Sequence, residues 1–228
     1  MSVNEKIKTI KIEEIFTSIQ GEGPYIGTKQ VFIRLCGCNL NCNYCDTYTG
    51  TTNAKDYTLE ELCSVVEKEK NIHSVSITGG EPLLHYEFLA DFCKKINIPI
   101  YLETNGTLCE ELRHIINNVD IVSADIKLKS ASGIELYEKH DEFIGICKSF
   151  NTDIFAKIVF DSNITDYEIN KVVEIAKKHN ILIVLQPMMK NDTMSVDGEF
   201  VEYIFNKFIQ LYKNVRLIPQ THKFLNLR

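Results

Sequence analysis

Residues 36–47 read CGCNLNCNYCDT and place four cysteines within ten positions, followed by an aspartate and a threonine. Taken alone, such a cluster is compatible with disulfides, a zinc site, an iron–sulfur cluster or chance grouping of small core residues. Cysteines this close in sequence pair poorly as disulfides. The flanking glycine and asparagines indicate a loop rather than core. The rest of the chain has to decide between the remaining possibilities.

The composition is that of a globular protein, and its cysteines favour a reducing compartment. The chain has 228 residues, of which 44% are hydrophobic, and it contains eight cysteines. A chain of this length does not need disulfides to hold its core, and clustered cysteines in a reduced cytosol usually bind metal or carry redox chemistry. We find neither a signal peptide nor an apolar run of about 18 residues, so we expect a cytoplasmic protein without a membrane span. The net charge of −6 disfavours direct nucleic-acid binding and favours a small-molecule partner.

Strand-like and helix-like segments alternate along the chain after VFIRL (31–35). Further strands are predicted at 73–78, 98–104, 120–126, 153–160, 181–186 and 214–218. Helices separate them, and capping boxes at residues 58–61 and 165–168 begin two of these helices. This order predicts a parallel sheet with right-handed crossovers. About six to seven such units are fewer than the eight of a closed barrel. We therefore expect an α/β fold, a partial, open (β/α)6-type barrel, in one domain over residues 1–228.

Four unusual segments follow predicted strands directly. The cysteine loop follows 31–35, TGGEP (78–82) follows 73–78, ETNGT (103–107) follows 98–104, and QPMM (186–189) follows 181–186. In barrels and open sheets of parallel strands, chemistry gathers where strands end and helices begin. We therefore expect all four segments to share one rim.

The spacing of Cys38, Cys42 and Cys45 is C-x3-C-x2-C. Three close thiolates suit a [4Fe–4S] cluster with one iron open to a non-protein ligand. A structural zinc would want a fourth ligand, and usually takes its cysteines as two separated pairs. The candidate is Cys36, but it lies at the end of a predicted strand, and we interpret it as a core thiol. The cysteines outside this loop are also expected in the core: Cys63, Cys93, Cys109 and Cys147.

C-x3-C-x2-C followed by GGEP on a partial barrel resembles the radical S-adenosylmethionine (SAM) family. The segments IFTSIQGEGPYIG (15–27), LETNGT (102–107) and RLIPQTHKFLNLR (216–228) extend the resemblance to the branch of that family that serves queuosine biosynthesis. The SIQGEG start and the QTHK end are the discriminating parts. The resemblance implies a lyase that converts 6-carboxy-5,6,7,8-tetrahydropterin to 7-carboxy-7-deazaguanine with loss of ammonia. It also implies Mg²⁺, a reductant such as flavodoxin or ferredoxin, and a homodimer.

The resemblance carries site roles to matching positions of this chain. The cluster ligands are Cys38, Cys42 and Cys45, and Thr47 stands at the magnesium position. Cofactor contacts are implied at Tyr44, Cys45, Asp46, Gly80, Glu81, Glu103, Ser123, Ala124, Asp125, Lys127, Gln186, Pro187, Met188 and Met189. Substrate contacts are implied at Ile19, Gln20, Gly21, Arg34, Thr78 and the terminal Arg228.

For some of these positions the residue type itself also suggests a role, independently of the resemblance. A guanidinium at Arg34 that faces the barrel interior needs an anion, either the substrate carboxylate or an internal acid. Gly79 and Gly80 permit a close backbone approach to the methionine part of SAM. The N-terminal segment and the C-terminal tail are expected to help close the site. The tail carries Phe224, Leu225 and Leu227 for burial, and His222 is expected to order it.

Residues 123–127 read SADIK, where members of the family often have Ser-Pro-Lys at the strand end. The Asp-x-Lys pattern of Asp125 and Lys127 resembles glycyl-radical activating enzymes instead, which act on a protein partner. Activation of a glycyl-radical enzyme is therefore a second hypothesis, which the SIQGEG and QTHK segments disfavour. A non-catalytic zinc-binding protein is a third, and it gives no reason for TGGEP on the same rim.

Overall fold

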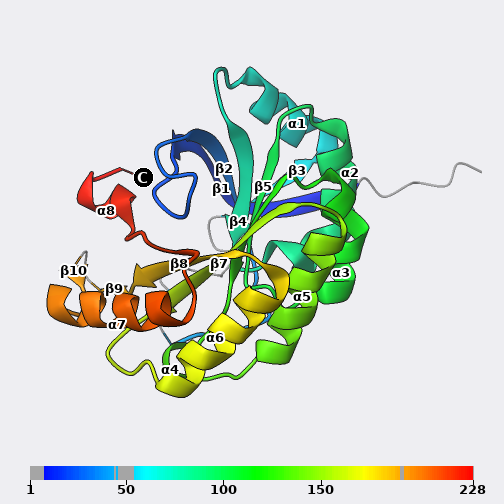
Figure 1. The fold of residues 1–228 in the computed structure, drawn as a ribbon. Coiled ribbons are helices and arrows are strands. Elements are labelled where there is room, and N and C mark those ends of the chain that lie inside the picture. The colour runs from blue at the N-terminus through cyan, green and yellow to red at the C-terminus, as the bar shows by residue number, and fades with distance from the viewer. Residues whose placement is uncertain (1–7, 44, 46–53, 191–192, 228) are drawn as a thin grey trace, which may run out of the picture.

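The structure is a computed structural model that describes residues 8–43, 45, 54–190 and 193–227. Figure 1 shows one twisted sheet with a row of helices along one of its faces. The strands of the sheet are β1 (Thr9–Ile19), β2 (Lys29–Leu35), β3 (Lys55–Thr58), β4 (Ser74–Gly79), β5 (Ile100–Thr104), β6 (Ile121–Asp125), β7 (Asp153–Phe160), β8 (Leu182–Pro187) and β11 (Val215–Leu217). A separate small pair consists of β9 (Met189–Lys190) and β10 (Thr193–Met194).

The helices connect consecutive strands or extend the last of them. They are α1 (Leu59–Lys68), α2 (Tyr86–Lys95), α3 (Cys109–Ile115), α4 (Lys129–Ser132), α5 (Tyr137–Ser149), α6 (Asp166–His179), α7 (Gly198–Leu211) and α8 (Thr221–Phe224), with 3-10 turns η1 (Pro82–His85) and η2 (Ile116–Asn118). The two predicted capping boxes are confirmed, since Thr58 and Thr165 each exchange hydrogen bonds with the glutamate three residues later.

The sheet has the order β11-β8-β7-β6-β5-β4-β2-β1-β3, with β11 and β3 at its two ends. All pairings from β11 to β2 are parallel, as the alternation of strands and helices predicts. The α/β prediction is therefore confirmed, and the described strands form an open sheet.

The strand β1 was not expected from the sequence. It pairs antiparallel with β2 on one side and with β3 on the other. Its register shifts between Ile12 and Glu14. Such an irregularity interrupts the two-residue alternation, so that Ile10 and Ile12 mark one face while Ile15 no longer keeps their period. The segment therefore lacks the simple strand signal in its sequence.

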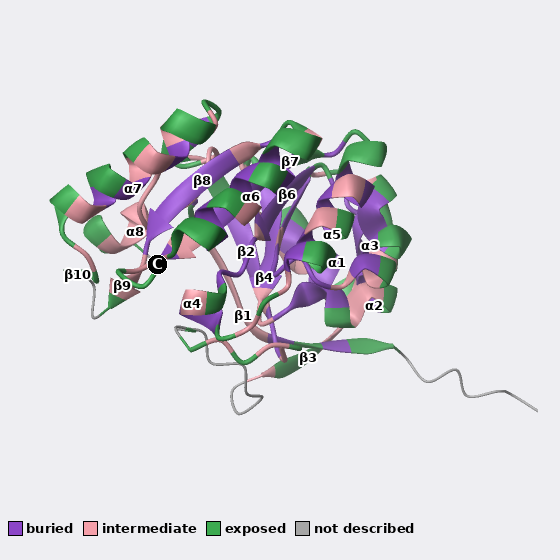
Figure 2. Cartoon of the chain, turned by 60° about the horizontal axis from the view of Figure 1, so that its bottom comes forward, coloured by how far each residue is buried: buried purple, intermediate pink, exposed green. Residues whose placement is uncertain are grey.

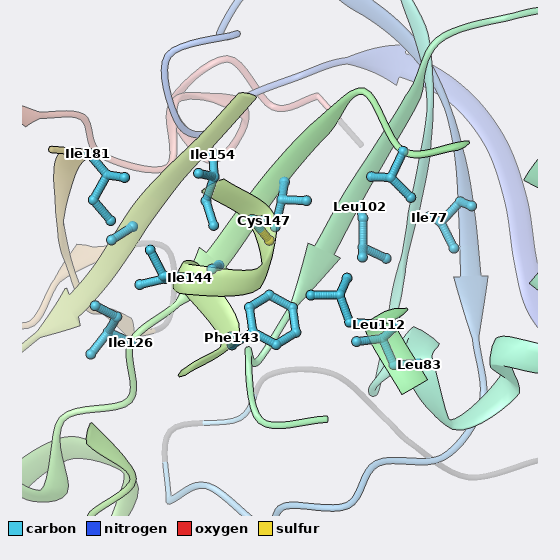
Figure 3. Close-up of a cluster of buried hydrophobic side chains, with 14 of the residues drawn as sticks. Ile77, Leu83, Leu102, Leu112, Ile126, Phe143, Ile144, Cys147, Ile154 and Ile181 are labelled. Atoms are coloured by element: carbon cyan, nitrogen blue, oxygen red, sulfur yellow. The ribbon is translucent and has the colours of Figure 1, made fainter. Parts of the chain in front are cut away.

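The main core lies between the sheet and its helices. Figure 2 shows buried residues along the strands and on the inward sides of the helices, with exposed residues on the outward sides. Figure 3 shows Phe143 and Cys147 of α5 among the strand residues Leu102 and Ile154. The four cysteines expected in the core are buried as free thiols: Cys63, Cys93, Cys109 and Cys147. No helix in the described part of the chain is long and apolar enough to cross a membrane.

The opposite face of the sheet changes character along the strands. Near the beginnings of β5 to β8 it carries a small second core of Tyr101, Ile121, Phe155 and Val184. Two residues further on, the same face carries Glu103, Ser123, Lys157 and Gln186, and these line a pocket. Because side chains alternate across a strand, the residues between them face the helices. The pocket therefore occupies the carboxyl ends of the parallel strands.

We expect Phe143→Ala to lower the free energy of unfolding by about 3–5 kcal/mol, because a fully buried ring leaves a cavity among α5, β5 and β7. Phe150→Ala is the matched control. This phenylalanine follows the same helix and is 42% exposed, so its loss is expected to cost less than about 1 kcal/mol. Urea unfolding of both variants measures the difference, and equal losses would contradict the assigned core.

Candidate active site

A pocket of about 260 Å³ lies at the carboxyl ends of the parallel strands. The cysteine loop, the GGEP turn, the segment after β5 and the segment after β8 all contribute to its wall, so the predicted common rim is confirmed. Of the residues expected at the site, the following line the pocket: Ile19, Gln20, Gly21, Arg34, Cys38, Cys42, Cys45, Thr78, Gly80, Glu103, Ser123, Asp125, Lys127, Gln186, Met188 and Met189. Tyr44, Asp46, Thr47 and Arg228 lie outside the described residues.

The three thiols of C-x3-C-x2-C lie on one side of this pocket, and Cys36 does not line it. Cys36 is buried instead, as expected for a core thiol. Burial raises the pKa of Cys38 and of Cys42, and the charge of Lys127 counteracts this effect at both. No three His, Cys, Asp or Glu side chains among the described residues converge on a site for a single ion. A four-iron cluster does not ask for such convergence, since each thiolate binds a different iron.

The GGEP turn touches the cysteine loop backbone to backbone. The amide N–H groups of Gly80 and Glu81 donate to the carbonyl oxygens of Leu35 and Gly37, at 3.1 and 2.8 Å. A Cβ on Gly80 would lie 1.9 Å from the Gly37 oxygen, and one on Gly79 would lie 2.2 Å from the Leu35 oxygen. Gly79 also has a φ of +127°. In this structure Gly79 is therefore required by contact with the end of β2, and Gly80 by contact with the cysteine loop.

Glu81 is fully buried and does not line the pocket. Its carboxylate accepts hydrogen bonds from the amides of Leu83 and Asn105 and from the hydroxyl of Thr104, at 2.8 to 3.0 Å. Burial raises its pKa to about 7 despite these donors. The side chain that was expected to contact the cofactor thus ties the GGEP turn to the segment after β5.

A ring of amides and a hydroxyl holds the cysteine loop against the segment after β5. Asn105 donates to Asn39 at 2.8 Å, Asn39 donates to Thr107 at 2.9 Å, and Thr107 donates back to Asn105 at 2.6 Å. Asn105 also lies 3.9 Å from the sulfur of Cys38, and the amide of Leu40 donates to that sulfur at 3.4 Å. These bonds fix where the first thiol enters the pocket. Asn39 and Thr107 were not expected at the site.

Two further expectations need correction. Ala124 belongs to the hydrophobic core, and Pro187 is buried; neither lines the pocket. The reason is the alternation of side chains along a strand. Ser123 and Asp125 face the pocket, so Ala124 between them faces the helices, and Pro187 likewise follows the pocket residue Gln186.

The pocket wall near β1 is a network of hydrogen bonds around Glu103. Its carboxylate accepts from Gln20 at 3.0 Å, from Thr78 at 3.0 Å and from Ser76 at 3.2 Å. Gln20 is held in turn by the buried Gln30, to which it donates at 3.0 Å. The amide of Gln20 is thereby fixed at the pocket surface. Gln30 was missed by sequence reasoning, and its signal was a glutamine directly before the apolar residues 31–33 of its strand.

Arg34 lines the pocket from β2, as expected. Its guanidinium pairs with the carboxylate of Glu14 directly across the antiparallel strand β1, at 3.1 Å. The internal acid that was one of the two expected partners is therefore Glu14. Phe16 and Phe32 stack beside this pair with ring centroids 5.0 Å apart, and both rings line the pocket. The wall thus offers a cation next to an aromatic surface.

A group of buried charges crosses the pocket. Lys127 lies 2.8 Å from Asp125, and Lys157 lies 3.4 Å from Asp125 and 2.5 Å from Glu22. Burial alone would raise the pKa of Asp125 and of Glu22, but the lysines outweigh it and hold both pKa values below their usual range. Lys157 and Glu22 were not expected at the site. The signal for Lys157 was a lysine in the middle of the apolar strand 153–160.

The polar surface of the pocket is compatible with a SAM-like ligand. The Oε1 atom of Gln186 is buried, lines the pocket wall and has no hydrogen-bond partner within the described protein. Buried polar atoms are almost always satisfied, so this oxygen calls for a donor on a ligand. Three thiols, a free amide oxygen and the lysine pair around Asp125 together fit a thiolate-bound cluster with a polar, amino-acid-containing cofactor.

The C-terminal tail closes one side of the pocket. The amide of Thr221 donates to the carbonyl oxygen of Gly21 at 2.9 Å, and a Cβ on Gly21 would lie 2.3 Å from the His222 ring. Figure 1 shows α8 beside the turn between β1 and β2. The expectation that the tail buries its apolar residues is wrong, since Phe224 and Leu225 are 53% and 60% exposed. Backbone and polar contacts dock the tail instead.

Comparison with known proteins shows to which family the chain belongs. The family model described as the radical SAM superfamily matches residues 32–195. A 7-carboxy-7-deazaguanine synthase from Geobacter sulfurreducens is 37% identical over 94% of this chain and 96% of its own length. One from Archaeoglobus fulgidus is 39% identical over 94% and 97%. The chain belongs to this synthase family of radical SAM proteins. Its fold is also similar to the crystal structure of QueE from Escherichia coli, with a TM-score of 0.67 and 24% identity over 94% of this chain and 95% of the other.

His140 shows how this member of the synthase family braces the segment that ends in Lys127. The amide N–H of Lys127 donates to Nε2 of His140 at 3.1 Å, so Nδ1 carries the proton and donates to the Gly106 oxygen at 3.2 Å. Burial, and after it the charge of Lys127, bring the pKa of His140 down to about 4. The neutral ring therefore joins the segments after β5 and β6.

This lowered pKa predicts a pH dependence of stability. The unfolded histidine takes up a proton near its ordinary pKa of 6.5, whereas the folded one stays neutral down to about 4. The contribution is therefore complete above pH 6.5 and is lost as the pH falls toward 4, by roughly 3 kcal/mol. Urea unfolding of the wild type and of His140→Gln between pH 7 and pH 4 should show a steeper fall for the wild type. Parallel curves would contradict the assignment.

Proposed function

We propose that this chain is a radical SAM lyase that converts 6-carboxy-5,6,7,8-tetrahydropterin to 7-carboxy-7-deazaguanine with loss of ammonia, in queuosine biosynthesis. The observation that carries the proposal is full-length similarity to synthases of that name, together with one pocket that gathers the three thiols and the buried charges. The direct test is anaerobic incubation of cluster-loaded, reduced protein with SAM and the pterin. The deazaguanine and ammonia should appear in equal amounts, and their absence would reject the proposal.

We call the part of the pocket lined by the three thiols, Lys127 and Gln186 its cofactor side. Cys38, Cys42 and Cys45 would hold the [4Fe–4S] cluster, and the oxygen of Gln186 and the charge of Lys127 would meet polar groups of SAM. When bound, the cluster and SAM supply the one-electron chemistry that starts the reaction. The protein residues orient the ligands and keep water out. The Asn39–Asn105–Thr107 ring contributes by holding the cysteine loop in place.

The substrate side is the wall formed by β1, β2 and the tail. Arg34, which Glu14 holds through its Nε, would pair with the substrate carboxylate through the rest of its guanidinium. The rings of Phe16 and Phe32 would offer apolar surface to the flat heterocycle. Gln20 and Thr78, fixed on Glu103, would present polar atoms to its edge. The carboxylate of Arg228 would accept from its N–H donors. A magnesium ion at Thr47, a flavodoxin or ferredoxin reductant and a homodimer complete the proposal.

The Asp-x-Lys pattern does not favour activation of a glycyl-radical enzyme here. Asp125 pairs with both Lys127 and Lys157 inside the pocket. Their spacing therefore has a local reason, and the synthase similarity extends over nearly the entire chain.

The four cysteines of the loop are expected to differ in their effect on cluster binding. We expect Cys38→Ala, Cys42→Ala and Cys45→Ala each to lose most of the bound iron and inorganic sulfide, because one of three protein ligands is missing. Cys36→Ala is the matched control and should keep the cluster, since its thiol is buried away from the pocket. Iron and sulfide content after anaerobic reconstitution measures both. Loss of iron in the Cys36 variant would overturn the ligand assignment.

The proposed role of the C-terminal tail predicts that extending the chain affects pterin binding but not SAM binding. The start of the tail is docked on Gly21 and Glu22, and the proposal has the terminal carboxylate of Arg228 meet the substrate, so residues added after Arg228 would remove that carboxylate. We expect a C-terminal hexahistidine extension to weaken pterin binding by tenfold or more, because a terminal charge-assisted contact contributes about 1.5–3 kcal/mol. SAM binding should stay within about twofold, and the same extension at the N-terminus is the control. Equal pterin affinity in both proteins would remove the C-terminal carboxylate from the site.

A further inference from the structure

The buried charges of the pocket form one continuous chain of contacts. Lys127 contacts Asp125, Asp125 contacts Lys157, and Lys157 contacts Glu22. The second carboxylate oxygen of Glu22 accepts from the side-chain amide of Gln220 at 2.7 Å. The chain thus begins at the strand end near the thiols, crosses the pocket on β7 and ends at the first residues of the tail.

Lys157 links the cofactor end of this chain of contacts to its tail end. It stands between two carboxylates, with Glu22 at 2.5 Å and Asp125 at 3.4 Å. Its side chain is 10% exposed, and those of Glu22 and Asp125 are 16% and 20% exposed, so water screens these charges poorly. Burial would lower the pKa of Lys157, but the two carboxylates together hold it well above its usual value. The lysine therefore stays charged, and each carboxylate competes for it.

We propose that Lys157 is a positioning residue that couples the cofactor side of the pocket to the substrate side, so that SAM and the pterin strengthen each other's binding. The inference rests on the proposed function for the identity of the two ligands. It goes beyond that function, because nothing in the reaction itself requires the two binding sites to communicate.

The direction of the coupling follows from the charges. A ligand carboxylate near Lys127 draws that lysine away from Asp125, which then depends on Lys157 for its counter-charge. Lys157 moves toward Asp125 from its present 3.4 Å and loosens its contact with Glu22. The carboxylate of Glu22 then has an oxygen available for N–H donors of a heterocycle lying between β1 and the tail. By reciprocity, a heterocycle that occupies Glu22 first releases Lys157 to Asp125 and Lys127 to the ligand carboxylate.

The remaining charges of the pocket do not replace this link. Glu103 is held by Gln20, Ser76 and Thr78, and Arg34 is paired with Glu14 on the opposite wall. Both stand outside the run of contacts from Lys127 to Gln220. Loss of the charge at position 157 should therefore remove the coupling between the cofactor side and the substrate side of the pocket, while each side keeps its own polar groups.

The test measures SAM affinity with and without saturating 6-carboxytetrahydropterin, by titration calorimetry on anaerobic, cluster-loaded enzyme without reductant, so that no turnover occurs. We expect the pterin to tighten SAM binding by on the order of tenfold in the wild type, within the usual range of coupling between two sites. In Lys157→Met both ligands should bind with no mutual effect. The matched control is Lys171→Met on α6, which removes an exposed lysine beside Glu174 and should keep the tenfold effect.

A second variant covers the case in which Lys157→Met does not fold, since it leaves two buried carboxylates with one fewer cation. Glu22→Gln with Lys157→Met removes one charge of each sign, and Asp125 keeps Lys127 as its partner. This double variant should also show no mutual effect. Persistence of the coupling in either variant, or its absence in the wild type when both ligands bind, would overturn the inference alone. Failure of the pterin to bind the wild type at all would overturn the proposed function, and the inference with it.

Discussion

The parallel strands bury one face against helices, and this constraint decides where chemistry is possible in the molecule. On that face the strands carry apolar residues throughout, and consecutive helices pack over them. Only the opposite face is left, and its first residues form a small apolar cluster. On β5 to β8 the polar groups of that face therefore collect on its last residues and in the loops that follow. The three thiols of the cysteine loop and the buried charges line the pocket there.

Contact between the loops then turns this region into a defined site. The cysteine loop is held from two directions, by the glycine turn after β4 and by the amide ring after β5. Glu81 joins these two supports from behind. The residues that touch the pocket are thus backed by bonds that are already made within the protein. Such preorganisation lets binding energy go into the ligand instead of into ordering loops.

The sequence predicted the parallel sheet, the common rim and the three thiols, because each depends on a local pattern. Strand–helix alternation, strand-end loops and cysteine spacing can all be read from neighbouring residues. The residues that were missed depend on distant ones. Lys157 becomes a pocket residue only through Glu22 and Asp125, and Gln30 only through Gln20. Ala124 and Pro187 were predicted to contact the cofactor because their neighbours in sequence do, although alternate residues of a strand face opposite sides of the sheet. Strand β1 was missed because its register shift interrupts the alternation of apolar and polar residues.

The contact between Gly21 and Thr221 has a consequence for the time course of biosynthesis. It joins an early segment of the chain to one of the last, so it cannot form while the chain is still being translated. At about 5–20 residues per second, ribosomal synthesis of the intervening segment takes roughly 10–40 s. During that interval the thiols of the cysteine loop already exist without the wall that the tail provides. The wall that Gln220 and His222 provide is therefore the last side of the pocket to form.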